Sequence, residues 1–128
     1  MQFEGCHLMP YRCPAGIWTC GWGSTGWGVI PGQAWTQAYA DQRRDMDIQK
    51  ARTAALRACP GLTSGRLEAV TDFVYNVGAG SLMASTLRRV VNARDWANVP
   101  AQLRRWVFGG GKRLRGLERR REAEILLL

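Results

Sequence analysis

Residues 4–25 read EGCHLMPYRCPAGIWTCGWGST. The four residues CPAG, at positions 13–16, combine Pro and Gly in a way that is typical of a turn. HLMPYR precedes this turn and IWTCGW follows it, and both segments are rich in residues that favour strands. The segment therefore predicts a β-hairpin, and the glycine-rich region around it, about residues 1–32, predicts a small β-rich lobe.

Helical patterns begin after this region. Residues 37–58 contain no Gly or Pro, Thr36 is a suitable N-cap, and Pro60 should end the helix. Residues 64–77 carry apolar side chains at helical spacing and form the most apolar of the expected helices. Gly78 should end this second helix.

Three further helices are expected, at about 86–92, 95–107 and 116–128. Ser85 should cap the first, and Pro100 should kink or restart the second. GGGKR, at 109–113, predicts a loop. With 128 residues we expect a single α+β domain, with a larger helical lobe at about 36–128.

The charge of the chain is strongly positive. Eighteen Lys and Arg residues against ten Asp and Glu give a net charge of +8. A cationic surface favours nucleic acid, anionic lipid or a bacterial cell wall, although a solvated basic face also serves solubility. No nucleic-acid motif is recognisable, no long apolar stretch suits a membrane span, and residues 1–15 lack a signal-peptide pattern. We therefore expect neither a nucleic-acid partner nor stable membrane insertion.

The metal-ligating residues are few. His7 is the only histidine, and the four cysteines form no CxxC pair. The sequence therefore predicts no metal site and no cofactor.

Glu4 and Thr19 are candidates for chemistry. A carboxylic acid beside apolar side chains can have a raised pKa and donate a proton near neutral pH. Thr19 and Cys13 can approach each other across the hairpin and orient a water molecule. The alternatives are a surface glutamate for Glu4 and an ordinary strand residue for Thr19.

Three blocks of the chain resemble the phage-type lysozymes, a family of muramidases among the glycoside hydrolases. The first is residues 3–25, in which Glu4, Cys13 and Thr19 have the spacing of that family's active site in its Glu/Cys/Thr subgroup. The others are RLEAVTDFVYNVGAGSLMASTLRRVVN, at 66–92, and RRWVFGGGKRLRGLERRREAEILLL, at 104–128. The resemblance implies a lysozyme-like α+β fold, with a cleft between the hairpin lobe and the helical lobe.

The resemblance also implies roles for three residues. Glu4 would protonate the glycosidic oxygen, and Thr19 would help to hold the water that attacks the sugar. Cys13 takes the position at which many relatives have a water-activating Asp. The substrate would be the β-1,4 bond between N-acetylmuramic acid and N-acetylglucosamine of peptidoglycan, and the family is regarded as inverting.

The thiol of Cys13 should differ from an aspartate in its pH dependence. A thiol with a pKa of about 8.5 is mostly neutral at pH 7, and a nearby anion would raise that pKa further. We therefore expect Cys13 to act mainly by positioning water, with activity that rises toward mildly alkaline pH. A disulfide of Cys13 with Cys6 or Cys20 would block the cleft.

Other positions differ from the family or keep two interpretations. Ser24 stands where many relatives have a His, and only MQF precedes Glu4, where relatives usually have a longer helix. This short segment suggests a truncated chain or a late start codon. Asn76 could line the cleft as a substrate-binding residue, with Ser24, or merely cap its helix. The spacing places Phe73 and Trp106 in the core, and predicts a solvated face for the arginines at 119–121.

The leading interpretation is a phage or prophage lysozyme that acts as a monomer on peptidoglycan. It would reside in the cytoplasm of the bacterial host until it is released to the periplasm. The alternatives are a lysozyme-fold remnant that binds peptidoglycan with little or no cleavage, and a cationic membrane or nucleic-acid binder.

Overall fold

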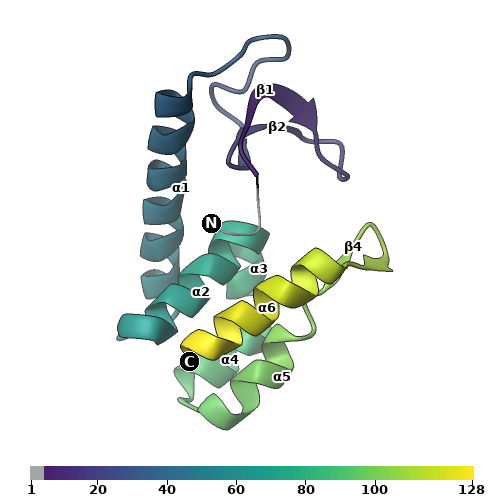
Figure 1. Ribbon diagram of the computed structural model, residues 1–128. Helices are drawn as coiled ribbons and strands as arrows, with labels where there is room; N and C mark the ends of the chain where they lie inside the picture. Colours follow the sequence, from purple (N-terminus) through teal and green to yellow (C-terminus); the bar gives the residue numbers. More distant parts are fainter. Residues whose placement is uncertain (1–4) are drawn as a thin grey trace. The chain divides into compact units, whose positions relative to one another are not determined.

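The computed structural model describes residues 5–128 of the chain. The chain divides into two compact units, Met1–Asp47 and Ile48–Leu128. Figure 1 shows β1 and β2 of the first unit in purple, the long helix that follows them in blue, and the later helices in teal to yellow. The division falls inside α1, Gln37–Ala58, so this helix contributes to both units rather than to the helical lobe alone. The single domain over 1–128 stays a prediction.

A three-stranded antiparallel sheet lies in the N-terminal unit. Its strands are β1 (His7–Arg12), β2 (Trp18–Gly21) and β3 (Ser24–Thr25). The predicted hairpin is confirmed as β1 and β2. The sequence does not mark strand β3 separately, because its two residues carry no pattern of their own and form a strand only by pairing with β2.

Helix α1 has the predicted bounds, and Thr36 caps it by accepting a hydrogen bond from the Tyr39 backbone N–H at 3.1 Å. The buried apolar cluster of the N-terminal unit is small: Cys20, Trp35 and Ala40. Arg43 of α1 is buried beside it, and its guanidinium donates hydrogen bonds to the backbone carbonyls of Thr25 and Trp27. A buried cation therefore supplements this small core.

The larger core lies in the helical unit. Helices α2 (Ser64–Val77) and α6 (Arg115–Leu127) approach so closely that a Cβ at Gly65 would lie 2.1 Å from the Leu127 backbone oxygen. Phe73 of α2 is fully buried, and Trp106 packs edge-on against it with the ring centroids 5.2 Å apart. The core positions expected for Phe73 and Trp106 are confirmed. Gly78, with φ +94°, ends α2 as predicted.

Short elements connect these helices. They are α3 (Ala79–Met83), α4 (Thr86–Asn92), the 3-10 helix η1 (Trp96–Asn98), α5 (Val99–Leu103), β4 (Phe108–Gly109) and β5 (Lys112–Arg113). Ser85 caps α4 by accepting a hydrogen bond from the Arg88 N–H, as predicted. Pro100 lies in the first turn of α5, which confirms the predicted restart. Within residues 5–128, no helix is both long and apolar enough to cross a membrane.

Two expectations for this region are wrong. The helix predicted for 95–107 ends at Leu103, so Trp106 and Val107 lie beyond it. The GGGKR segment is not an open loop, because β4 and β5 pair as a hairpin whose turn contains Gly110 and Gly111 at φ +58° and +79°. Positive φ at two consecutive residues is a conformation that glycine adopts readily.

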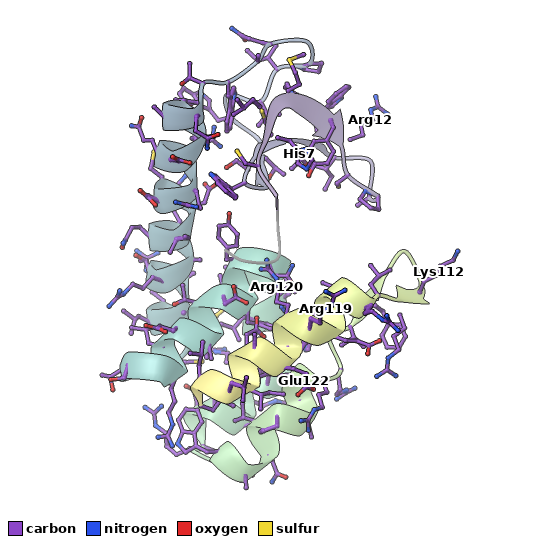
Figure 2. The ribbon with its side chains drawn as sticks, in the orientation of Figure 1. His7, Arg12, Lys112, Arg119, Arg120 and Glu122 are labelled. Carbon is purple, nitrogen blue, oxygen red and sulfur yellow. The ribbon has the colours of Figure 1, made fainter. Side chains whose placement is uncertain are left out.

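The arginine-rich face of α6 is also partly buried, contrary to the expected solvated face. Arg119 is exposed, whereas Arg120 and Arg121 are 2% and 0% exposed. Arg120 lies 3.5 Å from the Asp72 carboxylate on α2, and Arg121 lies 2.9 Å from Glu124 one turn later on α6. Figure 2 labels Arg119, Arg120 and Glu122 on this helix. The prediction failed because the carboxylate facing Arg120 comes from a distant segment.

Glu124 should make stability depend on pH. Burial raises the pKa of Glu124 to about 10, a hydrogen bond with Asp72 acts in the same direction, and Arg121 opposes both. The unfolded chain therefore loses this proton above about pH 4.3 while the folded chain keeps it, and the free energy of unfolding falls as pH rises. Glu124→Gln cannot ionise and should escape this loss.

The measurement is the thermal midpoint of both proteins at several values between about pH 5 and 9. The midpoint of Glu124→Gln should rise relative to the parent as pH increases. Glu122→Gln is the matched control, because Arg104 lowers the pKa of this exposed carboxylate and it stays ionised across the range. If the thermal midpoints of the parent and of Glu124→Gln differ by the same amount at every pH, Glu124 does not have the raised pKa in the folded chain.

Candidate active site

The turn of the β1–β2 hairpin carries Cys13, and β2 carries Thr19. The turn is closed by two backbone hydrogen bonds, from Cys13 N to Ile17 O at 2.9 Å and from Gly16 N to Cys13 O at 2.8 Å. Thr19 is 5% exposed, and its hydroxyl donates to Ile17 O at 3.0 Å. The expectation that Cys13 and Thr19 approach each other is consistent with this geometry, because both are bound to Ile17.

The turn changes the acidity of the Cys13 thiol. Backbone N–H groups stabilise the thiolate: a hydrogen bond from Ile17 lowers the pKa of Cys13 most, and Ala15 and the Thr19 hydroxyl act in the same direction against partial desolvation. The sequence predicts that a neighbouring anion would raise the pKa of this thiol further. Among the described residues, the pKa of Cys13 shifts in the opposite direction and is lowered. The reason is that the turn supplies hydrogen-bond donors whose positions cannot be read from the sequence alone.

Ser24 lies on β3, directly opposite Cys20 of β2. Its side chain is 2% exposed, and its hydroxyl donates to Asp47 Oδ2 on α1 at 2.6 Å. The structure therefore uses Ser24 to hold β3 to α1, a contact that sequence reasoning missed because 23 residues separate the partners. Its role in substrate binding stays a prediction.

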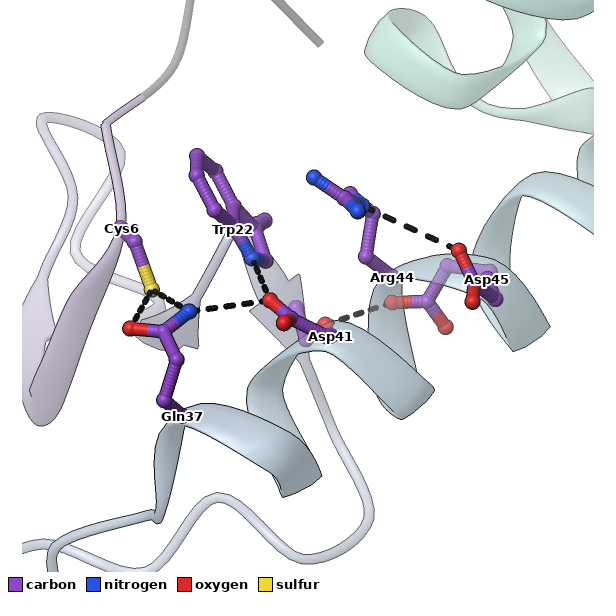
Figure 3. A network of polar contacts seen from close by, with 8 residues as sticks. Cys6, Trp22, Gln37, Asp41, Arg44 and Asp45 are labelled. Carbon is purple, nitrogen blue, oxygen red and sulfur yellow. Dashed lines mark hydrogen bonds and ion pairs between the residues drawn. The ribbon is translucent and has the colours of Figure 1, made fainter.

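A second polar network, drawn in Figure 3, joins the segment that follows β2 to the first turns of α1. The Trp22 indole N–H donates to Asp41 Oδ1 at 2.7 Å, and Gln37 donates to the same oxygen at 2.9 Å. Both hydrogen bonds lower the pKa of Asp41, and the bond from Trp22 has the larger effect. Gln37 also donates to Cys6 Sγ at 3.5 Å. Asp41 thus holds the end of β2 against α1 as a carboxylate.

Asn76 lies near the end of α2, in the helical unit. Its Oδ1 accepts a hydrogen bond from Arg121 Nη2 at 2.8 Å, so the side chain belongs to the buried arginine network of α6. Gly78, rather than Asn76, closes the helix by donating its N–H to Val74 O. Substrate binding by Asn76 stays a prediction.

Glu4 lies outside the described residues. The four cysteines, all within the described part of the chain, are free thiols: Cys6 and Cys13 are half-buried and Cys20 and Cys59 are buried. Burial raises the pKa of both buried thiols. No group of three or more His, Cys, Asp or Glu side chains suited to a metal ion occurs among residues 5–128.

The chain combines a short β-hairpin, which carries Cys13 and Thr19, with several packed helices. This combination places the chain in the lysozyme-like α+β class. Solved structures agree with this class. The muramidase domain of SpmX from Asticaccaulis excentricus matches with a TM-score of 0.86 and 26% identity, over 98% of this chain and 88% of that one. The active form of the P1 phage endolysin Lyz matches with a TM-score of 0.81 and 30% identity, over 98% and 78% of the two chains.

The sequence model of the Phage lysozyme family matches residues 1–124, and the chain belongs to this family. A SAR-endolysin of Bacteriophage PS119 is 37% identical over 125 residues, which cover 94% of this chain and 73% of that protein. The chain is therefore a lysozyme, a glycosidase with the lysozyme-like fold, as the resemblance of its three blocks implies.

The lowered pKa of Cys13 can be measured from its alkylation rate. In a Cys6→Ser background Cys13 is the one half-buried thiol, because Cys20 and Cys59 are buried. The iodoacetamide rate at Cys13, followed by peptide mass spectrometry, should rise with a midpoint below that of a free cysteine, about 8.5. Thr19→Val should move the midpoint upward. A midpoint at or above that of free cysteine would contradict the role of the turn.

Proposed function

We propose that this lysozyme hydrolyses the β-1,4 bond between N-acetylmuramic acid and N-acetylglucosamine in peptidoglycan, during phage-driven lysis of a bacterium. The match of residues 1–124 to the phage lysozyme family carries the proposal. Two named similarities support it: one solved neighbour is a muramidase domain, and another is the active form of a phage endolysin. The net charge of +8 also suits an anionic cell wall.

Three residues would share the reaction. Glu4 would act as the general acid that protonates the leaving glycosidic oxygen. Cys13 and Thr19 would hold the water that attacks the sugar from the opposite face. The N–H groups around Cys13 support a part for its thiolate in polarising that water, because they lower the pKa of the thiol.

Asn76 and Ser24 would contribute to substrate binding in different ways. With Oδ1 engaged by Arg121, Asn76 would offer its amide N–H groups to a sugar oxygen. Ser24 is buried, so it would act indirectly by holding β3 beside Thr19. We also propose that the enzyme works as a monomer, without a metal, cofactor or nucleic acid, after release to the periplasm.

Glu4→Gln tests the reaction itself. Removal of the general acid should lower kcat by about a hundredfold or more, because glutamine cannot donate the proton. The assay measures reducing ends released from purified Gram-negative peptidoglycan, and Glu122→Gln, an exposed carboxylate, serves as the matched control. A folded parent that binds peptidoglycan and releases no reducing ends would favour a binding remnant. Equal release by parent and Glu4→Gln would exclude Glu4 as the acid.

Cys13→Asp tests the part played by the thiol. Aspartate ionises near pH 4 and a free thiol near about 8.5, so the rise of activity with pH should occur at lower pH in Cys13→Asp than in the parent. The rise in the parent should still precede that of a free thiol, because the turn lowers the pKa of Cys13. Superimposable pH–rate profiles would show that ionisation at position 13 plays no part.

A further inference from the structure

Trp27 is unusual among the six tryptophans of the chain. Its side chain is 81% exposed, whereas the other five are buried or half-buried. An exposed indole costs solvation free energy and contributes little to a core. The ring of Trp27 is therefore available for contact with a ligand rather than with the core.

The backbone of Trp27 is held firmly although its side chain is exposed. Residues 26–29 form a β-turn in which the Val29 N–H donates to Gly26 O at 3.1 Å. Gly28, the third residue of this turn, has a φ of +82°, the positive value that a type II turn requires there. A Cβ at Gly28 would lie 3.0 Å from Arg43 Nη1 and 3.1 Å from the Tyr39 hydroxyl, so the turn packs closely against α1.

Two buried side chains fix carbonyls of this turn and of the residue that precedes it. Arg43 donates to the carbonyls of Thr25 and Trp27, and the Trp35 indole donates to the carbonyl of Gly28 at 3.1 Å. Arg43 and Trp35 are 6% and 8% exposed. The Arg43 guanidinium also lies 5.9 Å from the centre of the Trp27 ring, over one face. The indole is thus presented from a preorganised turn with most of its surface available.

The turn begins beside the candidate active-site strand. Thr25 of β3 lies opposite Thr19 of β2, and Trp27 follows Thr25 by two residues. Paired strand residues have Cα atoms about 5 Å apart, and two residues span at most about 7 Å. The Trp27 Cα therefore lies within about 12 Å of the Thr19 Cα, a reach of one or two sugar rings.

We propose that Trp27 is a stacking platform for a sugar ring of the glycan strand, one or two rings away from the bond held at Thr19. A sugar ring presents a flat face of C–H groups, which matches the open face of a fixed indole. The proposal rests on the proposed function, since it takes the glycan strand as the ligand. A lipid bilayer is the competing ligand, because Ile30 on the same loop is also 53% exposed.

The experiment compares Trp27→Ala, Trp27→Tyr and the control Ile30→Ala in the full chain. Initial rates on purified peptidoglycan give KM and kcat, and sedimentation with insoluble peptidoglycan gives binding without cleavage. Trp27→Ala should raise KM and weaken sedimentation about tenfold with little change in kcat, which corresponds to loss of one ring contact. Trp27→Tyr should restore most of the affinity, and Ile30→Ala should resemble the parent. Thermal midpoints should be unchanged, since the ring is exposed.

The outcomes separate this proposal from its alternatives. Unchanged KM and unchanged sedimentation for Trp27→Ala overturn it. A second result would also overturn the proposal. If both Trp27→Ala and Ile30→Ala lose binding to anionic phosphatidylglycerol vesicles while KM on peptidoglycan is unaltered, the loop binds a membrane rather than the glycan. If the parent binds peptidoglycan without cleaving it, the proposed function fails, while the sedimentation of Trp27→Ala still decides whether the indole binds glycan.

Discussion

The N-terminal unit depends on one buried cation, Arg43. A buried apolar cluster of three residues is too small to order the long loop between β3 and α1 by burial alone. Arg43 supplies two hydrogen bonds to that loop and packs 5.0 Å from the centre of the Trp35 ring. Because its partners are backbone carbonyls, the cation orders the loop whatever side chains the loop carries. This leaves position 27 free to hold an exposed aromatic ring.

The helical unit uses a second buried arginine differently. Arg121 binds the side chains of Glu124 and Asn76, and its guanidinium lies 5.2 Å from the centre of the Phe73 ring. A buried charge of this kind is costly unless its donors are engaged, so these contacts tie α2 and α6 in one relative position more strictly than apolar packing would. The close approach of α6 to Gly65 is a further constraint on the same pair of helices.

Local signals predicted the elements that depend on local chemistry. The CPAG turn, the Thr36 and Ser85 caps, Gly78 and the restart at Pro100 are determined by neighbours within a few residues, and all agree with the structure. Strand β3 and the β4–β5 hairpin have two-residue strands, which no periodicity reveals. The burial of Arg120 was missed for another reason: its partner Asp72 is 48 positions away, and only the packing of α2 on α6 brings the two together.

The candidate site shows the same division between local and distant information. The approach of Cys13 and Thr19 follows from a short hairpin and could be predicted, whereas the acidity of the thiol depends on where individual N–H groups point. A thiol in place of a carboxylate is a poor base in water at neutral pH because it is mostly protonated. The turn at 13–17 lowers the pKa of this thiol with backbone donors, which need no additional charged side chain. The hairpin turn is therefore both the element that positions Cys13 and the environment that stabilises its thiolate.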